Sequence, residues 1–293
     1  MRRTHCVTLA AVPWALAITI AAQSPSDVHV VLRQVSERLN QYYKRAQNVV
    51  FTEKKMMQPV SSDYSPQGFA RVTEYELRVE ADEADGDGSS EVKVVRQLLK
   101  VNGRAPREKD KKDRAGCTDE NPLSDEPLSF LLPANRGDYA FVLVGPGKGK
   151  DQHTLMIDFM STKREGKGEI TEDPAGREDC FSITFPVGVK GRVWVDAATY
   201  DVVRVEQRIA GMGDLPVPFK LARRHNLTDH IVLERNDRTI RYKLVAFSDP
   251  DETVLLPESI ETLRIFRGAI QSSRSRQAFS DYRRFVTGAR IVK

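Results

Sequence analysis

Apolar residues recur at two different spacings along the chain, and each spacing predicts a different kind of element. Between Ser26 and Ala46 they recur every three or four positions and form one stripe, which predicts an amphipathic helix. The residues of this stripe are Val28, Val31, Leu32, Val35, Leu39 and Tyr42. Because an apolar stripe must pack on something, we expect the rest of the chain to supply a surface for it.

From Asn48 onward, apolar and polar residues alternate, and this period of two predicts β-strands with one buried face. One long helix followed by many such strands is typical of the α+β class, so we expect a long N-terminal helix packed on an antiparallel sheet. The expected strands are Val49–Gln58, Arg71–Glu80, Val92–Val101, Tyr139–Val144, Thr154–Met160, Phe181–Val187, Gly191–Asp196, Asp201–Arg208, Ile231–Leu233, Thr239–Phe247, Ser259–Phe266 and Ala278–Val286.

The clearest hairpin joins Gly191–Asp196 to Asp201–Arg208 through a short polar turn. Side chains alternate across a strand, so Val193 and Val195 are expected to face the core. Trp194 then falls on the opposite face, where its neighbours along both strands are charged. Trp194 thus departs from the pattern of this strand pair, in which the face opposite the valines is otherwise charged.

Two further elements are less regular. Asp125–Leu132 predicts a second, short helix. A second hairpin is expected to turn at Asn236 and Asp237, between Ile231–Leu233 and Thr239–Phe247, because Asn and Asp are both turn formers.

The N-terminus reads as a secretory signal. Met1–Cys6 is positively charged, and Val7–Ala22 is an uncharged apolar run that ends in small residues suited to signal-peptidase cleavage. The alternative is an uncleaved membrane anchor, although the run is shorter than the ~20 residues of a span. We therefore expect residues 1–22 to be a signal peptide, residues 23–293 to form a single domain, and the protein to be periplasmic or secreted.

The net charge argues against nucleic-acid binding, whereas the distribution of charge leaves binding to anionic lipid open. Cleavage would remove two arginines and no acidic residue, so the formal net charge would fall from +4 to +2, which argues against a nucleic-acid binder. The C-terminal third is nevertheless basic, and could either meet anionic lipid headgroups or be a solvated sheet face. Its basic residues are Arg264, Arg267, Arg274, Arg276, Arg283, Arg284, Arg290 and Lys293.

Motifs for known chemistries are missing from the sequence. Gly145–Lys150 lacks the spacing of a phosphate-binding loop, so we expect a glycine-rich hairpin tip there. His225 and His230 are too few for a zinc site and are expected in a solvated loop. Acidic clusters such as Glu74 and Glu76 are expected on a solvated strand face. We therefore expect no catalytic residue, no metal and no cofactor.

The layout resembles a known family. An exported chain with an amphipathic helix and then a long antiparallel meander is similar to the lipoprotein-carrier family of the bacterial envelope, which localises outer-membrane lipoproteins. The strand pair Gly191–Asp196 and Asp201–Glu206, and the ending Phe279–Phe285, are similar to segments of such exported proteins. The resemblance implies a strongly curved half-barrel over residues 23–293 that shelters a hydrophobic cavity. It assigns no functional residue.

Cysteines allow one covalent link. Cys117 and Cys180 remain after signal cleavage, and an even pair in an oxidising compartment favours a disulfide. Two unpaired buried thiols are the alternative.

The leading functional hypothesis is therefore a non-enzymatic envelope protein that binds an apolar ligand, either a lipid or a lipid-modified protein, in the hollow of the sheet. The ligand-binding residues are unknown from sequence. The alternative is a structural or protein-interaction module of the cell envelope. An enzyme whose site is assembled from distant carboxylates is a third possibility.

Overall fold

A computed structural model describes residues 27–46, 49–82, 91–107, 128–162, 168–172, 181–248 and 251–284. The expected signal peptide and both cysteines of the expected disulfide, Cys117 and Cys180, lie outside these residues. Within them, no helix is both long enough and apolar enough to cross a membrane.

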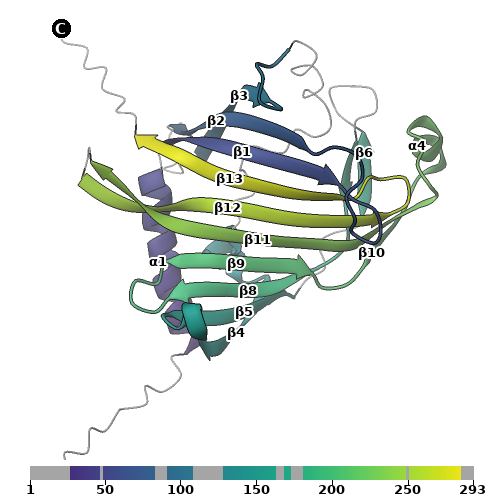
Figure 1. The fold of residues 1–293 in the computed structure, drawn as a ribbon. Helices are drawn as coiled ribbons and strands as arrows, with labels where there is room; N and C mark the ends of the chain where they lie inside the picture. The colour runs from purple at the N-terminus through teal and green to yellow at the C-terminus, as the bar shows by residue number, and fades with distance from the viewer. Residues whose placement is uncertain are drawn as a thin grey trace, which may run out of the picture.

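One antiparallel sheet dominates the fold (Figure 1). Its strands follow the order β3-β2-β1-β13-β12-β11-β9-β8-β5-β4, and β10 pairs with β11 at one end. The sheet is strongly curved and does not close, so the expected α+β half-barrel is confirmed. The strands are β1 (Val49–Pro59), β2 (Arg71–Asp82), β3 (Glu91–Val101), β4 (Tyr139–Pro146), β5 (Thr154–Ser161), β8 (Val189–Asp196), β9 (Val202–Ile209), β10 (Gly213–Pro216), β11 (His230–Ser248), β12 (Asp251–Arg267) and β13 (Ser273–Arg284).

Helix α1 (Val28–Ala46) crosses one face of this sheet near one end of its strands (Figure 1). We call the face that α1 covers the inner face and the opposite one the outer face. The predicted stripe is buried in the main core, with Leu32 and Val35 at 0% exposure. The short helices η1 (Ser129–Leu131) and α3 (Pro133–Arg136) close the same core beside β4, and Arg136 Nη2 donates to the carbonyl of Leu32 at 2.9 Å.

A second, smaller core lies at the far end of the strands. The two-stranded sheet of β6 (Glu169–Glu172) and β7 (Phe181–Thr184) and the short helix α4 (Phe219–Arg224) belong to this end. Its buried residues are Phe185, Leu215, Val217, Ala222, Ile231 and Leu233. The sequence pattern did not predict β6, β10 or α4, because elements of four to six residues are too short to show a period.

The second expected hairpin is wrong. β11 runs unbroken through Asn236 and Asp237, and the chain reverses between β11 and β12 instead. A register shift near Leu233 and Arg235 marks the only irregularity close to that point. Asn236 and Asp237 pair there with Arg264 and Leu263 of β12, so the long β11–β12 ladder overrides their turn propensity. Asp237 also forms an ion pair with Arg235, 2.5 Å from Nε to Oδ2.

The short helix expected at Asp125–Leu132 is corrected in its bounds. The described part of this region forms η1 and then α3, which Pro133 begins. Proline suits a first helical turn because its missing N–H would have no intrahelical partner there.

Candidate functional site

The hairpin of β8 and β9 places its side chains as the alternation predicts. Val193, Val195 and Val205 are each fully buried on the inner face. Trp194 lies on the outer face, with the guanidinium of Arg204 at 3.7 Å from its ring centroid and that of Arg192 at 5.9 Å. Trp194 therefore does not line the inner hollow, and its burial on the charged face comes from stacked arginines.

The inner face is closed where α1 covers it. Directly opposed residues on β5, β8, β9, β11 and β12 form what we call the closed row, and the register pairs them one after another. None exceeds 4% exposure. The closed row consists of Ile157, Val193, Val205, Ile240 and Ile260.

Two residues further along the strands, a distance of about 7 Å, the inner face opens. We call this next set of opposed residues the open row, and each member keeps part of its surface exposed. It also changes in polarity, because amide, hydroxyl and guanidinium groups replace the aliphatic side chains. The open row consists of Gly191, Gln207, Arg238, Thr262, Ser275, Met57 and Arg71.

The uncovered part of the inner face, which we call the hollow, has an apolar side toward β4. Phe130 and Phe159 pack there with ring centroids 4.4 Å apart, and Phe141 stacks on Phe130 at 6.3 Å. Tyr139 joins the same group at 5.4 Å from Phe130. Phe141 and Tyr139 are only partly buried, so aromatic surface remains at the edge of the hollow.

On β1, β2 and β3 the inner face carries an ionic cluster, which lies beside the main core on the closed side of the open row. Glu53 is 1% exposed in its side chain and forms an ion pair with Nη2 of Arg96, which is 18% exposed. The guanidinium of Arg96 also lies 5.0 Å from the ring centroid of Tyr75. Lys55 and Thr73 are buried beside them on the same face. Burying a charge costs free energy unless the charge is paired. This cluster therefore differs from the rest of the buried inner face, which is apolar.

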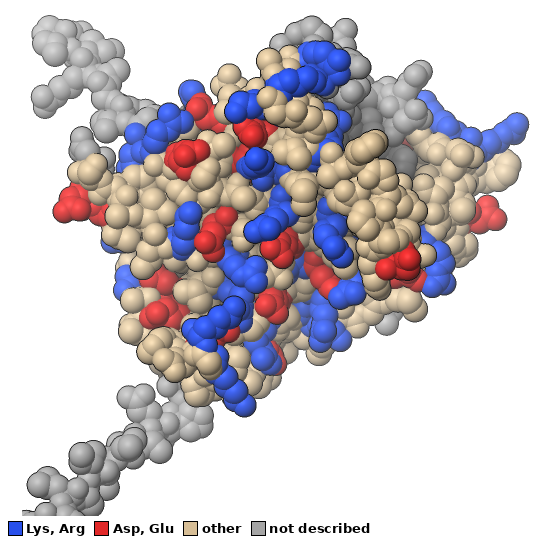
Figure 2. All heavy atoms as spheres, viewed as in Figure 1, with Lys and Arg blue, Asp and Glu red and all other residues tan. Residues whose placement is uncertain are grey.

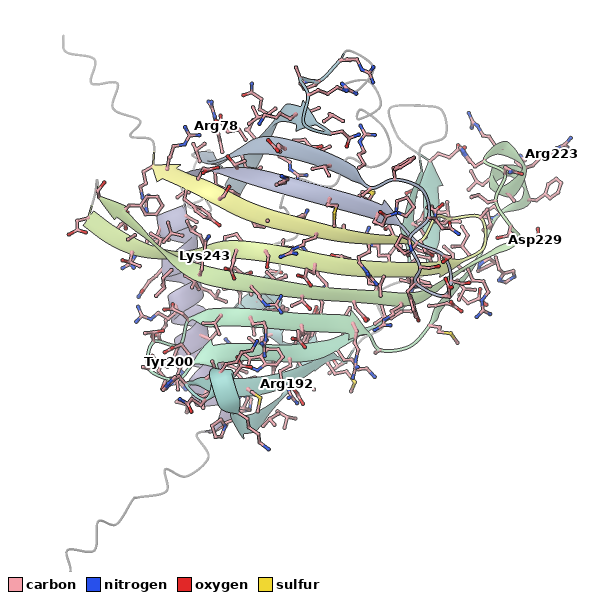
Figure 3. All side chains as sticks on the ribbon, in the orientation of Figure 1. Arg78, Arg192, Tyr200, Arg223, Asp229 and Lys243 are labelled. Atoms are coloured by element: carbon pink, nitrogen blue, oxygen red, sulfur yellow. The ribbon has the colours of Figure 1, made fainter. Side chains whose placement is uncertain are left out.

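The outer face carries charges of both signs across the whole sheet (Figure 2). One row of opposed residues contains Asp158, Arg192 and Glu206, which alternate in sign. Arg192 Nε and Nη2 donate to the two carboxylate oxygens of Asp158 at 2.5 and 2.9 Å. These bonds raise the pKa of the Arg192 guanidinium above its ordinary value. Figure 3 shows the same face with Arg192, Lys243 and Arg78 projecting from it.

The acidic cluster on β2 behaves as a solvated strand face. Glu74 lies 3.0 Å from Lys100 and 3.8 Å from Lys54. A hydrogen bond from Arg78 is the main cause that lowers the pKa of Glu76. Ion pairs with neighbouring cations on the strands thus account for both carboxylates.

Several basic residues of the C-terminal third are also ion-paired. Arg276 and Arg283 contact Glu261 and Glu76 at 3.8 and 3.2 Å. Arg284 contacts Glu252 at 2.6 Å, and Arg267 contacts Glu234. These pairs fit a solvated sheet face better than a free basic patch for lipid headgroups. Arg290 and Lys293 lie outside the described residues.

The remaining motif predictions have mixed outcomes. The glycine-rich tip is confirmed, since Gly147 N–H donates to the Thr154 carbonyl at 2.8 Å in the β4–β5 turn. His225 is not solvated, because its side chain is 4% exposed and lies 3.6 Å from Glu172. His230 is exposed and bonds Asp214 at 2.9 Å. No three metal-ligating side chains come together anywhere in the described ranges.

Comparison with known proteins gives only remote likenesses. No family model matches the sequence, and no curated protein matches it. A LolA superfamily protein from Nitrosomonas europaea is 11% identical, with a TM-score of 0.35, over 87% of this chain and 94% of that chain. A DUF1329 family protein from Desulfovibrio piger is 10% identical, with a TM-score of 0.33, over 89% and 94%. These remote likenesses include a protein of the LolA superfamily, the lipoprotein-carrier family that the sequence layout resembles.

Proposed function

We propose that the protein is exported and, without enzymatic activity, binds an apolar ligand, a lipid or a lipid-modified protein, in the hollow of its inner face. The observation that carries the proposal is the change from the closed row to the open row within two residues on β8, β9, β11 and β12. Protein interiors are close-packed, so the partly exposed side chains beyond the closed row leave surface that a ligand could cover.

The chemistry of the hollow suits an amphiphile such as a lipid. Aromatic side chains at Phe141 and Tyr139 would pack against hydrocarbon on the β4 side. The polar side, with Ser275, Gln207 and Arg71, would face the more polar end of the ligand. The curvature of the half-barrel would bring the two sides around one molecule.

Blocking the hollow tests this proposal. Ser275→Phe adds a ring to the open row, whereas Arg276→Phe adds the same ring to the outer face at the next residue of β13. Each exported protein would be analysed by gentle native mass spectrometry, followed by lipid extraction. We expect the parent and Arg276→Phe to carry a bound apolar species, and Ser275→Phe to lose at least about nine-tenths of it. A clean apo mass for the parent protein would overturn the proposal, as would equal ligand content in the two variants.

A second candidate, a protein-interaction module, is favoured by one observation. β4 ends the strand order and carries exposed apolar side chains on the outer face, with Val142 at 62% and Val144 at 46%. Exposed apolar edge strands can accept a strand from a partner. Chemical crosslinking in the envelope would test this candidate, and an uncrosslinked monomer would speak against it.

A further inference from the structure

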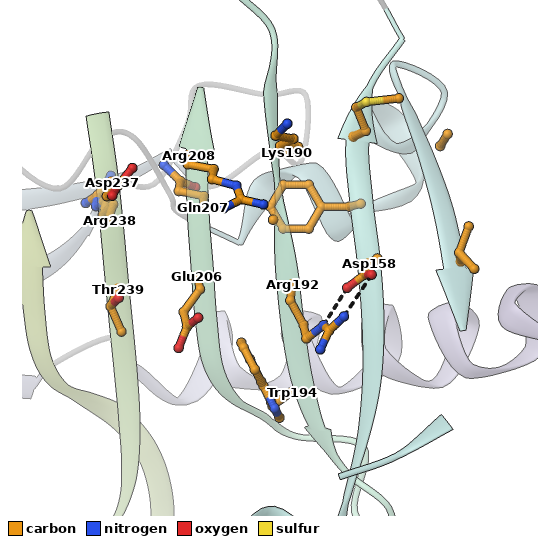
Figure 4. A pocket seen from close by; sticks show the side chains of 15 residues that line it. Asp158, Lys190, Arg192, Trp194, Glu206, Gln207, Arg208, Asp237, Arg238 and Thr239 are labelled. Atoms are coloured by element: carbon orange, nitrogen blue, oxygen red, sulfur yellow. Dashed lines mark hydrogen bonds and ion pairs between the residues drawn. The ribbon is translucent and has the colours of Figure 1, made fainter. Parts of the chain in front are cut away.

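A pocket of about 580 Å³ lies on the outer face (Figure 4), and its lining also includes Gly191, Gln207 and Arg238 of the open row. Most of its wall consists of outward side chains from β4, β5, β8, β9 and β11. A volume of this size falls within the range of small-molecule sites. The pocket is open on one side, so a ligand there would stay partly exposed.

Two cations stand at one end of this pocket. Lys190 on β8 is directly opposite Arg208 on β9. Like charges in this arrangement destabilise a sheet. Figure 4 shows both at the same end of the pocket, with the Arg192–Asp158 pair one row further along. Within the described part of the chain, neither Lys190 nor Arg208 forms an ion pair.

The carboxylates of the pocket are engaged by other arginines. Asp158 binds Arg192 through both oxygens, and Asp237 lies 2.5 Å from Arg235. Glu206 lies 3.5 Å from Arg204 Nε. The positive charge of Lys190 and Arg208 is therefore left for an external anion to neutralise.

An apolar strip continues from these cations in the same row. Met160 on β5 is directly opposite Lys190, and Ala140 on β4 is directly opposite Met160. Met160 is 50% exposed, and Val142, which follows Ala140 on the same face of β4 in the next row, is 62% exposed. The row thus changes from two cations to two apolar residues toward β4.

We propose that this pocket binds a small anionic amphiphile, with its anionic group between Lys190 and Arg208 and its hydrocarbon chain over Met160 and Ala140. Charge complementarity positions the anionic group of the ligand, because neither cation forms an ion pair with a carboxylate in the described part of the chain. The exposed apolar strip places the tail. Carboxylate and phosphate heads share the chemistry that the two cations recognise. The two cations and the apolar strip lie on the outer face, opposite the hollow, so the proposal does not depend on a ligand in the hollow.

Trp194 makes the site observable. It lines the pocket one row beyond Arg192. The chain has two tryptophans, so Trp14→Phe in the full chain leaves Trp194 as its single tryptophan, which excitation at the red edge of the indole band selects over tyrosine. We expect decanoate or decyl phosphate to change this fluorescence saturably, and the one that binds more tightly identifies the head group. Decanol, which has the same chain without the charge, should bind at least about tenfold more weakly.

Matched variants separate the site from general charge effects. Lys190→Gln/Arg208→Gln should weaken binding at least about tenfold. Lys220→Gln/Arg223→Gln removes the same charge from exposed positions on α4 and should leave binding unchanged. Ser275→Phe, which blocks the hollow, should also leave the Trp194 response unchanged. The proposal is overturned if neither amphiphile binds, if decanol or inorganic phosphate binds as tightly, if both charge variants behave alike, or if Ser275→Phe abolishes the response.

Discussion

Trp194 illustrates how single residues are accommodated on the charged face of this sheet. Its indole is 7% exposed although it points away from the core, because the guanidinium of Arg204 covers the ring. Arg204 is in turn held by Asp151 at 2.9 Å. A cation over an aromatic face is favourable by about 0.5–2 kcal/mol, depending on desolvation. The alternation predicted the face of Trp194, but the arginines that cover it come from the folded pairing of strands.

The Glu53–Arg96 pair is the residue-scale feature with the largest expected effect on stability. Arg96→Met would leave Glu53 buried without its charge partner, so we expect the free energy of unfolding to fall by about 3–5 kcal/mol. Urea denaturation followed by circular dichroism measures this change. Glu53→Leu/Arg96→Met should recover most of the loss, because both charges are then removed together.

A surface pair on the same strand provides the control. Lys100→Met removes an ion pair with Glu74, but Lys100 is 53% exposed and Glu74 20%. Exposed pairs contribute about 0–1 kcal/mol, so this variant should unfold close to the parent. Equal losses for Lys100→Met and Arg96→Met would contradict the role assigned to burial.

At the scale of elements, the β8–β9 hairpin depends on one glycine. A Cβ at Gly191 would lie 2.0 Å from the carbonyl oxygen of Glu206 and 2.8 Å from Cζ of Phe159. The first of these atoms belongs to the backbone of β9, so it can move only if the strands separate. Gly191→Ala should therefore destabilise the protein by about 1–3 kcal/mol, as overpacking does.

Gly211, just after β9, offers the matched substitution. A Cβ there would meet nothing within 4 Å, so Gly211→Ala should change the thermal midpoint little. Thermal unfolding of the two variants side by side checks the prediction. A parental midpoint for Gly191→Ala would show that the two strands are not packed as closely as described.

At the scale of the whole molecule, the expected Cys117–Cys180 disulfide stays a prediction. A link across a loop of roughly 60 residues would stabilise the fold by about 4 kcal/mol on the chain-entropy model, and often by less. Alkylation of the exported protein under denaturing, non-reducing conditions should label neither cysteine, and prior reduction should expose both. Two labelled cysteines without reduction would rule the link out.

The sequence by itself determined the class of the fold and the faces of its main strands. Local periodicity predicted the apolar stripe at Val28–Tyr42, the alternation of β2 and the buried valines of β8. Such periodicity can be recognised from residues that are close together in the sequence. Sequence motifs are also local, so the sequence alone could be searched for them. The residues of the hollow come from different strands, so the sequence alone could not identify them.

Only the tertiary structure decided where the inner face closes and where it opens. Ser275, Gln207 and Arg71 lie on different strands far apart in the chain, and no local pattern brings them into one row. The same holds for Lys190 opposite Arg208, and for Asn236 and Asp237, whose turn propensity gives way to the pairing of β11 with β12. Strand pairing is non-local, so it overrides a local turn signal and creates neighbours that the sequence separates.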